Sequence, residues 1–134
     1  MSNVVKSKRG VGKLSALTKA KELAVYTIKI TANKNIFVPE YWESITSDIV
    51  KTSKDIFEFL YEANNCDLYT EYELRRKLMN ESIRKCYRLL SLIDMSQPIF
   101  HLTYKRVAYW GDMTIEVRNL IRGMKKSDSN RIGK

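Results

Sequence analysis

The chain has 134 residues, of which 44% are hydrophobic, so it is long and apolar enough for one domain with a buried core and is not a disordered tail. Only five glycines and two prolines are present, which disfavours a turn-rich all-β fold. The net charge of +9, from 24 basic and 15 acidic residues, favours a polyanionic partner, either nucleic acid or an anionic membrane surface, over charge that serves solubility alone.

The sequence also predicts where the protein resides. No apolar run approaches the roughly 20 residues of a membrane span, and no apolar segment follows the basic N-terminus as in a signal peptide. Cys66 and Cys86 form no zinc motif, and we expect both to be reduced thiols. These features predict a cytoplasmic protein that does not enter a membrane.

Residues 1–13 form a basic stretch that contains no acidic residue and two glycines. We expect a flexible arm that solvent surrounds or that becomes ordered on a phosphate backbone. Its cations are Lys6, Lys8, Arg9 and Lys13.

Two helices are predicted in the first half of the chain, at about 15–34 and 39–64, because apolar residues recur at steps of three and four. Pro39 suits the start of the second helix, since it has no N–H to leave unpaired. The range 39–64 carries six acids against two lysines, so we expect it to face away from a polyanion. The residues expected to point inward are Leu17, Ala20, Leu23, Ala24, Thr27 and Ile28 in the first helix, and Trp42, Ile45, Ile49, Thr52, Ile56, Phe59 and Ala63 in the second.

A third helix is predicted at about 70–97, with Thr70 and Glu73 as a capping box, Tyr69 and Leu74 as a hydrophobic staple, and Pro98 at its end. Its expected buried stripe is Leu78, Met79, Ser82, Ile83, Cys86, Leu89, Leu90 and Ile93.

A fourth helix is predicted at about 103–126, with Thr103 as its N-cap. Its expected inner face is Tyr104, Val107, Ala108, Gly111, Ile115, Ile121 and Met124, and residues 129–134 are expected to fray. Four long helices joined by short loops predict an all-α domain over residues 14–128, an up-down-up-down antiparallel four-helix bundle.

Basic residues gather on the two later helices, whereas acids gather on the second. Rows at helical spacing predict one cationic surface, because these helices are neighbours in a bundle and arginine grips phosphate through its planar fork. The predicted nucleic-acid contacts are Lys77, Arg84, Lys85, Arg88, Lys105, Arg106, Arg118, Arg122, Lys125 and Lys126, with the cations of the N-terminal arm. Tyr109 and Trp110 lie beside this region, where burial in a core or interface is favoured over base stacking.

The sequence contains no recognisable catalytic or cofactor motif. The paired Glu-x-x-His motifs of a di-iron bundle, a glycine-rich phosphate loop and a nucleophile motif are all absent. The only histidine, His101, falls in a predicted surface loop. We therefore expect a binding protein with no enzyme activity, no cofactor and no metal.

Several strings carry a resemblance to a known family over about residues 15–128. In chain order they are Tyr26, Ile36-Phe37-Val38-Pro39, Ile49-Val50, Ile56, Tyr61-Glu62-Ala63-Asn64, Arg84-Lys85-Cys86-Tyr87-Arg88-Leu89-Leu90, Lys105-Arg106-Val107-Ala108-Tyr109-Trp110, Glu116-Val117-Arg118-Asn119-Leu120-Ile121 and Lys125-Lys126-Ser127-Asp128. The chain resembles the accessory variability determinant proteins of diversity-generating retroelements. That group belongs to a larger four-helix-bundle family, which includes proteins encoded in 23S rRNA intervening sequences.

The resemblance implies a homopentameric barrel that binds the element's reverse transcriptase and nucleic acid. Such a protein supports mutagenic, adenine-directed cDNA synthesis from the template-repeat RNA and performs no chemistry itself. Three alternatives stay open: a protein of the rRNA-intervening-sequence type, a purely structural oligomer, and an enzyme.

Overall fold

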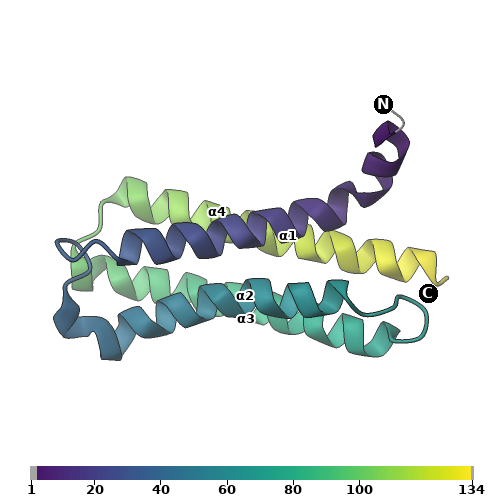
Figure 1. The fold of residues 1–134 in the computed structure, drawn as a ribbon. Coiled ribbons are helices and arrows are strands. Elements are labelled where there is room, and N and C mark those ends of the chain that lie inside the picture. The colour runs from purple at the N-terminus through teal and green to yellow at the C-terminus, as the bar shows by residue number, and fades with distance from the viewer. Residues whose placement is uncertain (1–2, 134) are drawn as a thin grey trace.

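The computed structural model describes the backbone of residues 3–133 and the side chains of residues 16–133. Its long helices are α1 (Asn3–Thr31), α2 (Ser47–Asn64), α3 (Tyr72–Phe100) and α4 (Tyr104–Arg131). A 3₁₀ turn η1 (Pro39–Tyr41) and a π-helical turn η2 (Trp42–Thr46) precede α2. The helices run alternately up and down, with α1 packed on α2 and α4, and α3 on α2 and α4 (Figure 1). The predicted all-α four-helix bundle is therefore confirmed, and residues 3–133 contain no strand.

Trp110 is the largest fully buried side chain among the described residues. Its indole Nε1 donates a hydrogen bond to Thr27 Oγ1 at 3.1 Å, and Thr27 Oγ1 donates to the Leu23 carbonyl at 2.8 Å. Phe37 packs edge-on against Trp110 at 6.1 Å between ring centroids, and Phe100 lies 4.6 Å from Phe37. One aromatic cluster therefore closes the end of the bundle where α1, α3 and α4 meet the connecting turns.

The helix boundaries differ from the sequence prediction at the N-terminal end. The first helix begins at Asn3 rather than near residue 15. The side chains of Lys6, Lys8, Arg9 and Lys13 lie outside the described side chains, so their role as an arm on nucleic acid stays a prediction.

The predicted second helix is interrupted. The π turn η2 holds one more residue than an α turn would. The extra residue rotates the side chains before it away from the buried face of the helix, on which Ile45 and Ile49 lie. Trp42 is consequently about half exposed, although the sequence pattern placed it inside. Ile28, in α1, is also exposed rather than inward.

The predicted capping box of the third helix is wrong. Its N-cap is Glu71, and no side chain bonds to the first turn. Thr70 instead donates from its backbone N at 2.8 Å and its hydroxyl at 3.0 Å to Asp67 Oδ2, while Glu71 Oε1 accepts from Asp67 N at 2.8 Å. The bonds from Thr70, backbone first, lower the pKa of Asp67. The short polar residues organise the turn, which leaves none to cap the helix.

The third helix also runs past Pro98 to Phe100. Proline removes only its own N–H from the ladder, and the backbone N–H of His101 still reaches the Gln97 carbonyl. His101 then adopts the left-handed conformation, φ 55° and ψ 45°, that ends the helix. This residue is exposed, and Thr103 caps α4 as predicted, its Oγ1 accepting from Arg106 N at 3.1 Å.

The buried face of the fourth helix is displaced from the predicted one. Tyr104 is 83% exposed and Ala108 is exposed, whereas Trp110 and Val117 are fully buried. The helix also continues to Arg131 instead of fraying after residue 128. Its buried residues are Trp110, Thr114, Val117, Ile121, Met124 and Asp128.

The two cysteines differ in accessibility. Burial raises the pKa of Cys86 to about 12, and the partly buried Cys66 also has a raised pKa, first through desolvation. We expect iodoacetamide at pH 8 to alkylate Cys66 slowly in the folded protein and Cys86 only in urea, because the thiolate is the nucleophile. Intact mass would show one adduct and then two, and two adducts on native protein would contradict the burial of Cys86.

Candidate nucleic-acid interface

The α4 cations predicted to act together share the flank of the helix that faces α3. Arg118, Arg122 and Lys125 are spaced by four and three residues, which places them in one row along α4. The row lies beside α3 because α3 and α4 are joined by a tight turn and pack antiparallel.

Tyr87 of α3 anchors two of these cations. The guanidinium carbon of Arg118 lies 5.5 Å from the centroid of the Tyr87 ring, and that of Arg122 lies 5.8 Å from it. Arg122 Nη2 also donates a hydrogen bond to the Tyr87 hydroxyl, and Arg118 donates from Nε and Nη2 to Asn119 Oδ1. Cation–π contacts at such exposed sites contribute about 0.5–1 kcal/mol each. The two arginines are thereby held in place before any ligand arrives.

The row continues into an open groove between the start of α3 and the end of α4. We call this the α3/α4 groove; its lining residues are Tyr72, Glu73, Arg76, Arg122, Lys125, Lys126 and Ser129. Desolvation lowers the pKa of Lys125, and the charges of Arg76 and Arg122 lower it further. Four cations therefore share a groove that has one acidic residue, Glu73, in its lining.

The cations of this groove are not neutralised within the described part of the chain. Among residues 16–133, no carboxylate forms an ion pair with Arg76, Arg122 or Lys125, nor with Lys126. Holding like charges together costs free energy in the unliganded protein, and a bound polyanion would relieve that repulsion. The α3/α4 groove can thus hold phosphate groups by charge and by the donor geometry of its arginines.

The predicted α3 row does not join this groove as a whole. Lys85 Nζ lies 4.0 Å from Asp55 Oδ2, and Arg88 Nε donates to Thr52 Oγ1 at 3.2 Å, so both reach toward α2. Arg84 is exposed and only 3.9 Å from Glu81 of its own helix. Lys77 is exposed and lines a shallow depression beside Arg76.

Lys105 and Arg106 lie at the opposite end of α4. Sixteen residues separate Arg106 from Arg122, which is roughly 24 Å along a helix. These two cations therefore belong to a separate part of the surface.

The sequence prediction missed Arg76 and Tyr87 as members of the site. They stand eleven residues apart, or three helical turns, so they share one stripe of α3. The same spacing from Lys77 leads to Arg88, on a neighbouring stripe, so extending the predicted α3 row would not have found them. The sequence did not show that the stripe of Arg76 and Tyr87, rather than that of Lys77 and Arg84, faces α4.

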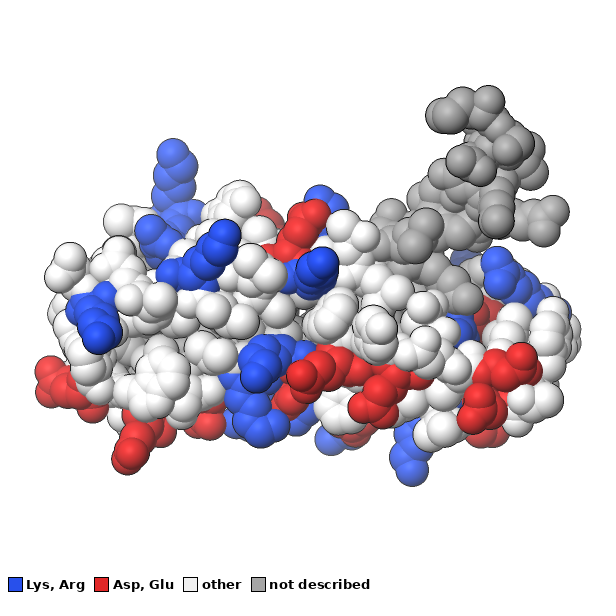
Figure 2. Space-filling view, viewed as in Figure 1, with Lys and Arg blue, Asp and Glu red and all other residues white. Residues whose placement is uncertain are grey.

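Charge is distributed differently on the opposite side of the bundle. Figure 2 shows the face made by α1 and α2, with acidic side chains gathered along the edge where α2 runs. This agrees with the excess of acids predicted for residues 39–64. A polyanion on the α3/α4 groove would therefore be kept away from the acidic helix.

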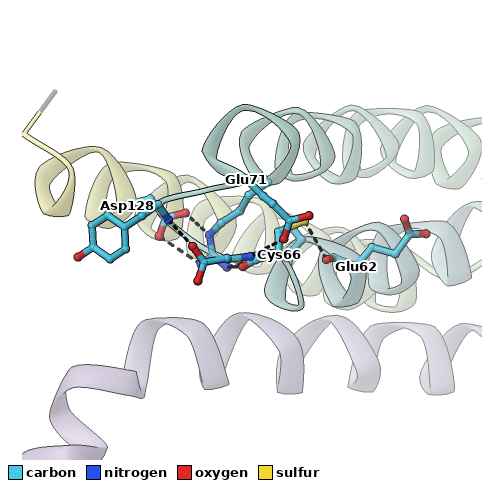
Figure 3. Close-up of polar contacts among 8 residues, drawn as sticks. Glu62, Cys66, Glu71 and Asp128 are labelled. Carbon is cyan, nitrogen blue, oxygen red and sulfur yellow. Dashed lines mark hydrogen bonds and ion pairs between the residues drawn. The ribbon is translucent and has the colours of Figure 1, made fainter.

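A buried ion pair fixes the end of the bundle next to the groove. The side chain of Arg75 is 1% exposed and that of Asp128 is 4% exposed. Arg75 Nε lies 2.6 Å from Asp128 Oδ2, Nη2 lies 3.2 Å from Oδ1, and Nη1 donates to the Ala63 carbonyl at 3.0 Å. Figure 3 shows Asp128 beside the turn that carries Cys66 and Glu71. The pair, with Ala63, ties α2, α3 and α4 together.

Within residues 16–133, no group of three His, Cys, Asp or Glu side chains converges as metal ligands. No helix described here is long and apolar enough to cross a membrane.

No family model matches the chain, and neither a curated protein nor a solved structure gives a match.

Proposed function

We propose that this protein is a non-catalytic accessory subunit of a diversity-generating retroelement. It acts as an oligomeric, homopentameric scaffold that binds the element's reverse transcriptase and its template RNA or cDNA, and so supports mutagenic reverse transcription. The proposal places this work in the cytoplasm and assigns no reaction to the chain. The sequence resemblance supplies the biological setting.

The observation that supports nucleic-acid binding is the unneutralised charge of the α3/α4 groove. Arg76, Arg122, Lys125 and Lys126 converge there, and Arg118 extends the row along Tyr87. Contacts of this kind position a phosphate backbone without reading its sequence. A scaffold with several copies would repeat the groove and strengthen binding by avidity.

A charge-reversal variant tests the groove directly. Replacing Arg118, Arg122 and Lys125 together by glutamate is expected to weaken single-stranded RNA binding at least about 100-fold at 0.1 M salt, and to reduce the log–log salt slope by about 2, at roughly 0.7 per phosphate contact. Binding would be measured by fluorescence anisotropy over a salt series, with circular dichroism as the check on helix content.

The matched control carries the same change in charge away from the groove, at Lys21 and Lys29 of α1 and at Lys34 in the turn that follows it. Lys21, Lys29 and Lys34 are all exposed, so their triple glutamate variant alters net charge equally without touching the groove. The control is expected to bind RNA within about threefold of wild type, because only bulk charge has changed. Equal losses in the two variants would refute a localised groove.

The setting is tested by purifying the tagged protein from its native host and sequencing the RNA that accompanies it. Template-repeat RNA together with a reverse transcriptase would support the proposal. Ribosomal RNA would favour the alternative, a bundle protein of the 23S rRNA-intervening-sequence type. Protein that carries neither RNA nor polymerase would leave a structural oligomer and defeat the proposal.

A further inference from the structure

A second groove, between α1 and α4, differs in character from the cationic one. It encloses about 690 Å³ and includes the apolar side chains Tyr109, Met113 and Leu120. Tyr109 is 57% exposed, and its ring is held edge-on against Tyr26 at 5.3 Å between centroids. A firmly held, largely exposed aromatic side chain is a common anchor of protein interfaces.

The rim of this α1/α4 groove is acidic. Asp112 and Glu116 both line it, are exposed, and form no ion pair within residues 16–133. Glu22 also lines the groove but is partly neutralised by Lys19 at 3.5 Å. Two unpaired carboxylates repel a nucleic acid, so the occupant should be a cationic protein surface with apolar side chains.

The outward face of α3 on another copy has the complementary character. Arg84 and Arg88 are exposed on it and lack a carboxylate partner on any other described helix. They stand four residues apart, about 6 Å along the helix, which is the separation of Asp112 and Glu116 on α4. Leu74 and Met95, each about half exposed on α3, provide apolar side chains near its two ends.

We infer that the α1/α4 groove of one protomer receives the outward face of α3 from a second copy of this chain, with Asp112 and Glu116 facing Arg84 and Arg88. Because α1 packs on α2 and α4, α3 lies diagonally across the bundle from it, and the two surfaces are distinct. The contact is therefore heterologous, and repeating it builds a ring or a chain rather than a two-fold dimer. The inference deepens the proposed function, on whose oligomeric scaffold it rests, by naming the subunit interface.

The test is a charge swap followed by light scattering during gel filtration of the purified protein without RNA. Two variants are made: Asp112→Arg with Glu116→Arg, and Arg84→Glu with Arg88→Glu. Each alone is expected to associate at least about 100-fold more weakly than wild type, because like charges then face each other. The chain carrying all four substitutions is expected to recover the wild-type assembly, since opposite charges meet again. An equimolar mixture of the two variants is expected to associate only by alternating them, which cannot close a ring of five.

Matched controls reverse the same charges elsewhere. Glu40→Arg with Glu43→Arg, and Lys21→Glu with Lys29→Glu, change exposed residues outside both surfaces and are expected to leave the mass of the assembly unchanged. The neutral pair Asp112→Asn with Glu116→Gln, which keeps the shape of the side chains, replaces the arginine variant if circular dichroism shows that the latter is misfolded.

Three results would each overturn the interface. They are a monomeric wild type, a single-surface variant that assembles like wild type, and a chain with all four substitutions that stays dissociated. Loss of RNA binding from the Arg84 and Arg88 variant with no change in mass would overturn it in favour of a nucleic-acid role for that face. Assembly and RNA binding are read separately. The Arg118, Arg122 and Lys125 variant therefore tests the proposed function alone.

Discussion

Replacing Asp128 by alanine is expected to lower the free energy of unfolding by about 3–5 kcal/mol. The change leaves the Arg75 guanidinium buried without its counter-charge, and removing one partner of a buried ion pair typically costs this much. The free energy of unfolding of a typical domain is only about 5–15 kcal/mol in total. The loss should therefore shift the midpoint of unfolding to a lower urea concentration. Arg75→Ala is expected to be as severe, because it also unpairs the Ala63 carbonyl.

Two controls separate this effect from ordinary loss of charge. Lys19→Ala breaks the exposed pair with Glu22 and is expected to cost less than about 1 kcal/mol. Arg75→Met combined with Asp128→Leu removes both charges and should recover most of the lost stability, since apolar replacements of buried pairs are often neutral. A cost near 1 kcal/mol for Asp128→Ala, measured by urea unfolding, would mean that the pair is solvated in solution.

Replacing Trp110 by alanine is also expected to lower the free energy of unfolding by about 3–5 kcal/mol. The indole is fully buried and contacts Phe37, and its Nε1 donates a hydrogen bond to the Thr27 hydroxyl. Tyr104 of the same helix provides the control, because it is 83% exposed and its replacement by alanine is expected to cost below about 1 kcal/mol. Calorimetry or urea unfolding would compare the two, and equal costs would show that α4 is rotated from its position here.

The fold class was predictable because it depends on features that repeat along the chain. Four stretches with helical periodicity and short links leave few arrangements other than a bundle. The Thr103 cap is confirmed, and most of the predicted α3 stripe is buried, although Leu78 and Leu90 are only partly so. The rotation of α4 was not predictable in the same way. Val107, Gly111 and Ile115 form a plausible apolar stripe, whereas the buried face includes the polar residues Thr114 and Asp128.

The candidate site was half predictable for a similar reason. Helical spacing grouped Arg118, Arg122 and Lys125 because they follow one another on one helix. The part that depends on the rotation of α3, with Arg76 and Tyr87 turned toward α4, required the packed structure. The Arg75–Asp128 pair joins residues 53 positions apart, and neither residue carries a local signal of burial.

The α3/α4 groove is encoded without interruption between Tyr72 and Arg131, on one helical hairpin with a short connection at His101. A single contiguous stretch of gene therefore specifies both its walls and the turn that sets them side by side. Natural variation confined to that stretch could alter ligand preference while α1 and most of α2 kept their inherited sequences. Homologues that bind nucleic acid in the same way should then keep positive charge along this hairpin, together with the residues that pack beneath it.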